Sequence, residues 1–90
     1  MITLKSAHEI ELMRRAGKIT AAARAVARDM VKPGVTTQQI DKAVHRFITE
    51  QGAIPSFLHY NGYPASVCVS VNDEIIHGIP GKRVLQEGDI

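Results

Sequence analysis

Apolar residues recur every three or four positions through the first third of the chain. The stripe consists of Leu12, Ala16, Ile19, Ala23, Val26 and Met30. This spacing places the six side chains on one face of an α-helix. Ser6 and Glu9 have the capping-box spacing that begins a helix, and Pro33 ends the helix near residues 31–32 because proline disfavours a helical residue before it. We therefore predict a first helix of about 25 residues.

A second apolar stripe follows a short link that contains proline and glycine. It consists of Ile40, Val44, Phe47 and Ile48. Thr36 and Gln39 form another capping box. Val35 and Ile40 occupy the two positions of a hydrophobic staple, and Gly52 is placed to cap the C-terminus. We expect two amphipathic helices packed as a helical hairpin.

The hydrophobic period changes to two between residues 66 and 71. Valines alternate there with serine and cysteine, so the three valines share one face of an extended chain. The Asn-Asp pair at 72–73 suits a two-residue turn because both residue types tolerate positive φ. Residues 74–77 are then the return strand. We predict an antiparallel β-hairpin, and with the two helices the fold class is α+β.

The length of 90 residues allows one small domain, because a chain this short buries only about 60–65% of its unfolded surface. The hydrophobic content of 44% is typical of a globular protein. No segment approaches the roughly 20 apolar residues of a membrane span, and the N-terminus lacks the apolar block of a secretory signal. The single cysteine, Cys68, excludes an internal disulfide and is typical of a reducing compartment.

The net charge of +2 comes from 11 basic and 9 acidic residues. Five basic residues gather on the predicted first helix: Arg14, Arg15, Lys18, Arg24 and Arg28. We interpret them as a solvated helix face, because the two Tyr and two Phe do not interleave with the arginines as they do in a nucleic-acid interface. We therefore expect neither DNA nor a membrane as a partner.

The last residues indicate an interrupted element. Glu87-Gly88-Asp89 has the composition of a turn, and it leads into a strand at Ile90, where the printed sequence stops. We therefore expect residues 1–90 to be a single partial domain, truncated within a sheet. An open sheet edge and an uncovered valine face would make such a piece self-associate or be marginally stable.

His77 is the strongest candidate for chemistry. It is predicted at the end of a strand beside Gly78, where a ligand can approach the backbone, and its imidazole can donate or accept a hydrogen bond near neutral pH. The alternative is a histidine that only caps the hairpin. The other histidines, at positions 8, 45 and 59, have no H-E-x-x-H spacing, so local spacing builds no metal site.

Cys68 and two tyrosines are further candidates. Cys68 is open to three interpretations, a nucleophile, a metal ligand or a pocket wall, and the wall is favoured because no nearby cation or helix N-terminus lowers the pKa of a thiol there. Tyr60 and Tyr63 precede the predicted hairpin and either face a site or simply pack.

Four stretches of the chain form a distinctive series. They are S-A-H-E-I-E-L-M-R-R-A-G, V-K-P-G-V-T-T-Q-Q-I-D, Y-N-G-Y-P-A-S-V-C-V-S-V-N-D-E-I-I-H-G-I-P and L-Q-E-G-D-I. In this order they resemble the N-terminal part of type I methionine aminopeptidases, over nearly all 90 residues. The third stretch is highly specific. The resemblance implies the N-terminal half of a pita-bread fold, in which two similar α/β halves surround a dinuclear metal site.

The resemblance also implies an activity and a set of site residues. The family removes the initiator methionine from new proteins when the second residue is small. By position, His77 matches the histidine that hydrogen-bonds the peptide and stabilises the reacting amide. Tyr60, Tyr63 and Cys68 match residues that line the pocket for the methionine side chain, and Phe57 falls at another pocket position.

The resemblance implies a metal centre whose ligands are not found among these residues. The family uses two divalent metal ions, held by two aspartates, a histidine and two glutamates, and all five ligands follow the G-D-I stretch. None of them is among residues 1–90, so we expect no metal ligand here and no activity from the 90 residues alone.

Two other functions compete with this interpretation. One is a non-catalytic pita-bread relative that binds a protein or RNA, and the other is an X-Pro-cleaving metallopeptidase of the same fold. The S-V-C-V-S-V-N-D-E stretch favours methionine. The partners implied are the N-termini of nascent chains in the cytoplasm, with the ribosome close by.

Overall fold

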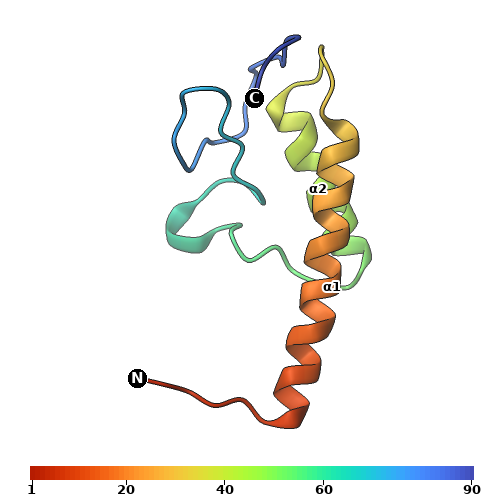
Figure 1. The fold of residues 1–90 in the computed structure, drawn as a ribbon, viewed down its shortest axis with the longest axis vertical. Coiled ribbons are helices and arrows are strands. Elements are labelled where there is room, and N and C mark those ends of the chain that lie inside the picture. Colours follow the sequence, from red (N-terminus) through yellow and green to blue (C-terminus); the bar gives the residue numbers. More distant parts are fainter.

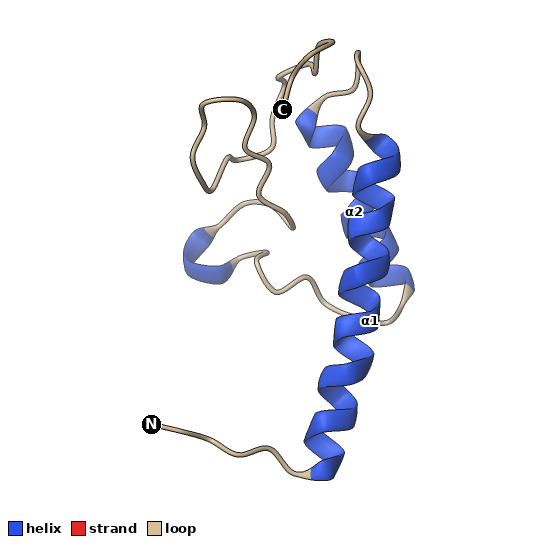
Figure 2. Cartoon of the chain, in the orientation of Figure 1, coloured by secondary structure: helices blue, strands red, loops and turns tan.

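The computed structural model describes all 90 residues and contains two α-helices, one 3-10 turn and no β-strand (Figures 1 and 2). Helix α1 spans Ala7–Met30, helix α2 spans Thr37–Glu50, and the 3-10 turn η1 spans Tyr60–Gly62. The two α-helices lie against each other as a hairpin. Both predicted helices and their connection are confirmed. The chain after α2 consists of loops and turns that lie along one side of the helical hairpin (Figure 1).

Both helices begin with the predicted capping boxes. The Ser6 hydroxyl accepts a hydrogen bond from the Glu9 backbone N–H at 3.2 Å, and the Glu9 carboxylate accepts one from the Ser6 N–H at 2.8 Å. These bonds hold the pKa of the Glu9 carboxyl below its usual range. Thr36 and Gln39 repeat the pattern at 3.1 and 2.8 Å. Each cap satisfies orphan N–H groups and contributes about 1 kcal/mol.

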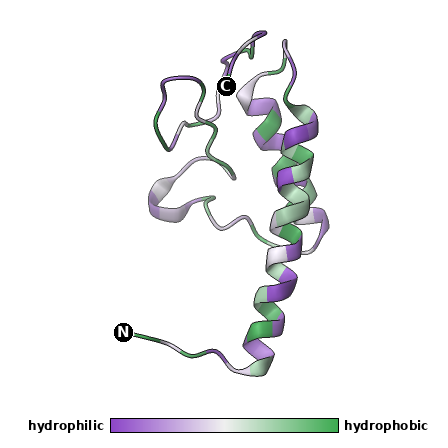
Figure 3. Cartoon of the chain, in the orientation of Figure 1, coloured by the Kyte–Doolittle hydropathy of each residue, from purple (hydrophilic) through white to green (hydrophobic).

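The apolar stripe of α1 is covered only along its second half. Ala23 is buried, whereas Leu12 is 47% exposed and Met13 is 56% exposed. Helix α1 has 24 residues and α2 has 14, so α2 cannot reach the first turns of α1. The early turns of α1 accordingly project beyond the rest of the molecule, with hydrophobic and hydrophilic positions alternating along them (Figures 1 and 3).

The core lies where α2 meets two loop segments. Ile40 of α2 packs with Val71 and Leu85, which come from far along the chain. The partly buried residues around this cluster are Ala27, Met30, Val35 and Val69. Ten of the 90 residues are buried, so the core is small, as expected for a chain of this length.

The C-terminal segment is tied to the link between the helices. Thr36 and Val84 form an isolated antiparallel bridge. Beside it, the Leu85 N–H donates to the Val35 carbonyl at 2.8 Å, and the Gly34 N–H donates to the Leu85 carbonyl at 2.8 Å. The sequence pattern did not predict this pairing, because an isolated bridge has no periodic signature.

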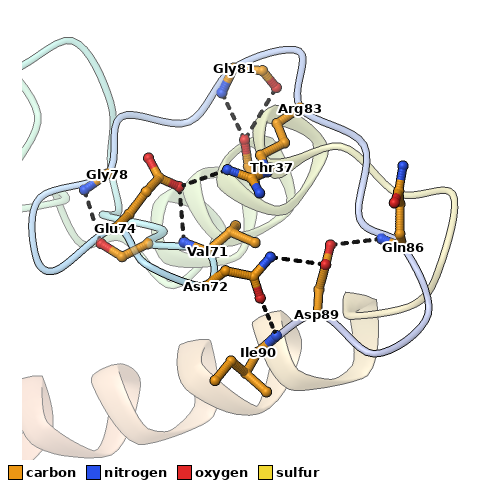
Figure 4. A network of polar contacts seen from close by, with 11 residues as sticks. Thr37, Val71, Asn72, Glu74, Gly78, Gly81, Arg83, Gln86, Asp89 and Ile90 are labelled. Atoms are coloured by element: carbon orange, nitrogen blue, oxygen red, sulfur yellow. Dashed lines mark hydrogen bonds and ion pairs between the residues drawn. The ribbon is translucent and has the colours of Figure 1, made fainter.

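Side chains provide further ties in the same region (Figure 4). The Thr37 hydroxyl accepts from the Gly81 N–H at 2.8 Å and donates to the Gly81 carbonyl at 3.2 Å. The Asn72 side chain donates to the Asp89 carboxylate at 3.0 Å and accepts from the Ile90 N–H at 3.0 Å. The hydrogen bond from Asn72 is the main reason that the pKa of the Asp89 carboxyl lies below its usual range, and the bond from the Gln86 backbone N–H contributes in the same direction.

The predicted β-hairpin is wrong for these 90 residues. Segments 66–70 and 75–79 share one backbone hydrogen bond, from the Val69 N–H to the Gly78 carbonyl at 2.8 Å. His77 has φ 57°, so the chain leaves the extended region there and cannot continue a ladder. The predicted strand at Ile90 is also absent. Helices and loops, and not an α+β arrangement, therefore make up these residues.

A turn nevertheless forms where the hairpin turn was predicted. Asn72 takes the left-handed conformation with φ 57°, and the Glu74 N–H donates to the Val71 carbonyl at 3.2 Å. The Glu74 carboxylate then accepts from the Val71 N–H at 3.0 Å (Figure 4). A side chain thus takes the donor that a neighbouring strand would use in a ladder.

Segments 66–70 and 75–79 approach each other most closely at Gly78, so a side chain at that position should lower stability. A Cβ there would collide with the Val69 carbonyl oxygen and lie 2.7 Å from its carbonyl carbon. We expect Gly78→Ala to lower the free energy of unfolding by about 3 kcal/mol, because neither backbone can yield without breaking the bond between them. Urea denaturation followed by circular dichroism measures this change.

Gly17→Ala is the matched control. Gly17 lies inside α1, where an added Cβ would meet no atom within 4 Å. We expect that substitution to raise the free energy of unfolding by up to about 1 kcal/mol through helix propensity. Equal stabilities of the two alanine variants would contradict the close packing at Gly78.

Candidate functional site

One open pocket of about 560 Å³ lies between the turn η1 and the loops on either side of it. Its lining consists of Phe57, Tyr60, Asn61, Gly62, Tyr63, Pro64, Cys68, His77 and Ile79. The pocket is larger than the hollow of about 380 Å³ beside the core. Ligand sites are typically mostly apolar pockets of this size with a few polar groups, so this pocket is the candidate site.

All five residues singled out from the sequence line this pocket: Phe57, Tyr60, Tyr63, Cys68 and His77. They come from three segments, and the fold brings them together even though the predicted hairpin is absent. Sequence reasoning missed Asn61, Gly62, Pro64 and Ile79 as lining residues. The signal for them was only their position beside the singled-out residues in the chain.

A compact loop presents the aromatic side chains. The Tyr60 N–H donates to the Phe57 carbonyl at 3.0 Å, and the His59 N–H donates to the Tyr63 carbonyl at 2.8 Å. His59 reverses the chain with φ 66°, a left-handed conformation. As a result the Phe57 and Tyr63 rings meet edge to face, with centroids 6.4 Å apart and planes at 80°.

Tyr63 connects this loop to the other two segments of the pocket. Its hydroxyl donates to the Val67 carbonyl at 2.9 Å and lies 3.4 Å from the Gly78 carbonyl oxygen. Burial raises the pKa of Tyr63 to about 12, and the neighbouring Cys68 thiol and Asp41 carboxylate act in the same direction. Tyr63 therefore stays a neutral hydrogen-bond donor across the physiological pH range.

His77 stands at the exposed rim of the pocket. Its backbone has φ 57°, an uncommon conformation for a residue with a side chain. The next residue, Gly78, is buried, and its N–H donates to the Ser70 hydroxyl at 3.1 Å. The neighbouring glycine is therefore anchored on both sides while the imidazole remains free to meet a ligand.

The pocket combines aromatic walls, one thiol and one imidazole. Such a lining suits a slender apolar side chain, with the imidazole as a hydrogen-bond partner for a polar group at the entrance. The remaining histidines do not line it: His8 is exposed on the first turn of α1, His45 lies on α2 beside a separate hollow, and His59 is exposed just before η1.

The 90 residues contain no group of three or more His, Cys, Asp or Glu side chains placed to hold a metal ion. They do not, therefore, provide the ligands of a metal centre by themselves. Neither helix is both long enough and apolar enough to cross a membrane.

Comparison with known proteins finds several relatives that are named methionine aminopeptidase. Methionine aminopeptidase 1 of Bacillus subtilis is 51% identical over 90 residues, which are all of this chain and 36% of that protein. Methionine aminopeptidase 1D, chloroplastic/mitochondrial, of Arabidopsis thaliana is 57% identical over 81 residues, which are 90% of this chain and 23% of that protein. The chain thus spans about a third or less of the length of these relatives.

Solved structures of methionine aminopeptidases are also similar to this chain. The crystal structure of methionine aminopeptidase from Rickettsia prowazekii matches 99% of this chain and 36% of its own, with a TM-score of 0.94 and 42% identity. That from Thermotoga maritima matches with a TM-score of 0.91, also at 42% identity. The resemblance to methionine aminopeptidases that the sequence motifs indicated is confirmed.

A family model covers nearly the whole chain. The model described as Metallopeptidase family M24 matches residues 11–90, which include both helices almost entirely and every residue that lines the pocket. The residues therefore belong to metallopeptidase family M24.

Proposed function

We propose that residues 1–90 are the N-terminal half of a pita-bread catalytic domain and that the protein containing them is a methionine aminopeptidase. It removes the initiator methionine from nascent proteins whose second residue is small. The observation that carries the proposal is the convergence of five residues on one pocket. About 50% identity to proteins named methionine aminopeptidase supports it.

The pocket suits the methionine side chain. That side chain is unbranched and ends in a polarisable thioether, which packs favourably against aromatic rings and contributes about 0.3–1.5 kcal/mol for each sulfur–aromatic contact. Phe57 and Tyr63 supply ring edges at right angles to each other, and Cys68 supplies a small wall beside them. Tyr60 also lines the pocket.

His77 is the proposed catalytic residue among these 90. From the rim of the pocket its imidazole can donate a hydrogen bond to the carbonyl of the methionine residue whose side chain fills the pocket. A donor held in this place stabilises negative charge that develops on the carbonyl oxygen in the transition state.

The family name implies divalent metal ions, and the residues present do not fit such a centre, since no cluster of three potential ligands exists among them. We propose that the ligands of the two ions lie outside residues 1–90. The 90-residue chain by itself is then inactive, and its part in the reaction is to bind and orient the substrate.

The assay of the whole protein tests this function. We expect release of methionine from a Met-Ala-Ser peptide, abolished by a metal chelator, and no release by residues 1–90 alone. An intact peptide after incubation with the whole protein and divalent metal would show that the activity is wrong. Chelator-sensitive release by the 90 residues alone would show that the proposed place of the ligands is wrong.

In the same assay, His77→Asn tests the proposed catalytic residue. Asparagine tolerates positive φ, so the substitution removes the imidazole and retains the backbone. We expect kcat to fall about 100-fold, the typical effect of removing one such donor. His8→Asn, at an exposed position on the first turn of α1, is the control and should leave kcat unchanged. A kcat that falls less than twofold in His77→Asn would contradict the role of His77.

The titration of Tyr63 tests the geometry of the pocket wall. The folded pKa of about 12 exceeds the unfolded value of about 10, so this phenol stabilises the fold below pH ~10 and its contribution is lost between about pH 10 and 12. We expect the late phenolate absorbance, and the steep loss of stability in that range, to disappear in Tyr63→Phe. Tyr60→Phe should retain both, and a Tyr63 pKa near 10 would contradict the burial of its phenol beside Cys68.

We also propose partners for this part of the chain. Five exposed basic residues on α1 suit a position near the ribosome in the cytoplasm, and exposed Ile75, Ile76 and Ile79 suit self-association of the isolated 90 residues. Sedimentation of the isolated 90 residues, with and without ribosomes, tests both proposals. A monomer at every concentration that does not sediment with ribosomes at low salt would contradict them.

A further inference from the structure

Asp41 lies on α2, outside the pocket, yet its carboxylate holds the pocket wall. A single oxygen, Oδ1, accepts hydrogen bonds from two successive backbone N–H groups, that of Ser66 at 2.8 Å and that of Val67 at 3.0 Å. These residues directly precede Cys68, which lines the pocket. Bonds to a carboxylate are shorter and stronger than those between neutral groups.

Segment 66–70 has few other ties to the molecule. Among its backbone N–H groups, only that of Val69 donates to a backbone carbonyl. Ser66 is 6% exposed, so its N–H would be buried without an acceptor if Asp41 were removed. The Asp41 carboxylate thus accepts backbone hydrogen bonds that the carbonyl groups of a neighbouring strand would accept in a sheet.

His45 strengthens the same attachment one turn further along α2. Its Nδ1 lies 2.9 Å from the Ser66 hydroxyl oxygen. Asp41 and His45 are four residues apart and share one face of α2, so the helix holds both the backbone and the side chain of Ser66. Both residues line a separate hollow of about 410 Å³ and are absent from the pocket lining.

The attachment continues from Val67 into the pocket. The Val67 carbonyl, whose N–H is bound by Asp41, accepts the hydrogen bond from the Tyr63 hydroxyl at 2.9 Å. The same hydroxyl lies 3.4 Å from the carbonyl oxygen of Gly78, the residue after His77. A continuous series of hydrogen bonds therefore joins α2 to all three chain segments that line the pocket.

We infer that Asp41, supported by His45, is a positioning residue for the proposed methionine pocket: it fixes the 66–68 segment that carries Cys68 and, through the Val67 carbonyl, orients Tyr63. Asp41 does not touch the substrate. The inference rests on the proposed function for the identity of the ligand, whereas the attachment itself can be measured without any activity.

The test uses Asp41→Ala in the whole protein, with Asp41→Asn as the conservative variant and Glu50→Ala as the control. Asparagine retains an acceptor oxygen, and Glu50 is an exposed carboxylate near the end of the same helix. Three quantities are measured: hydrogen exchange at the Ser66 and Val67 amides, the rate at which a thiol reagent labels Cys68, and kcat and KM for the Met-Ala-Ser peptide.

In Asp41→Ala we expect exchange of the two amides and labelling of Cys68 to rise about tenfold, because the segment opens locally. We expect KM to rise about tenfold while kcat changes less than twofold, because the loosened wall weakens binding of the methionine side chain equally in the ground state and the transition state. Asp41→Asn should give intermediate values, and Glu50→Ala should match the unsubstituted protein.

Unchanged exchange in Asp41→Ala would overturn the attachment. Raised exchange with unchanged KM would overturn the positioning role. Should Asp41→Ala fail to fold, Asp41→Asn and His45→Ala are judged by the same three quantities. An unsubstituted protein that releases no methionine would refute the proposed function, and exchange at Ser66 and Val67 would still decide whether Asp41 holds the segment.

Discussion

Hydrogen bonds between side chains and backbone hold the chain together beyond α2. In a sheet, neighbouring strands satisfy one another's N–H and carbonyl groups, but here segments 66–70 and 75–79 share one such bond. Asp41, Thr37 and Asn72 supply acceptors and donors in place of a strand. Buried backbone groups cannot be left unpaired without loss of stability, so these three side chains help to fix where the loops run. The pocket is built on loops that are attached to α2 and to the link between the helices.

This arrangement explains how a pocket forms in a chain with so small a core. The cluster of Ile40, Val71 and Leu85 brings both loop segments onto α2, and polar contacts then fix their register. Directional bonds specify position better than apolar packing, which tolerates sliding. The aromatic wall of the pocket depends on that register, because the Tyr63 hydroxyl must meet the Val67 carbonyl. If the proposed function is right, substrate recognition will depend on polar residues, Asp41 among them, that the substrate does not touch.

The helices were predictable from sequence because capping boxes and apolar stripes depend on residues within a few positions of one another. The hairpin was not, because alternation over 66–71 reports which side chains share a face and not whether a partner strand is present. Four of the five pocket residues were already candidates from local pattern, whereas Phe57 and the assignment of all five to one pocket came from the motif resemblance, which carries information that local pattern lacks. Asp41 and His45 were missed as contacts of the pocket wall, since their partner Ser66 lies more than twenty positions away. Only the folded structure shows that these residues lie next to Ser66.

Because its first turns are uncovered, the two parts of α1 are stabilised by different interactions. Near Ala23 the helix is held by α2 and the core, whereas around Leu12 it is held only by its own hydrogen bonds and the cap at Ser6. The first part therefore obeys helix–coil statistics and frays progressively from its end, while the second melts together with the core. Heating the chain would consequently give a broad loss of helical signal before the cooperative transition. The van't Hoff enthalpy taken from ellipticity would then fall below the calorimetric one.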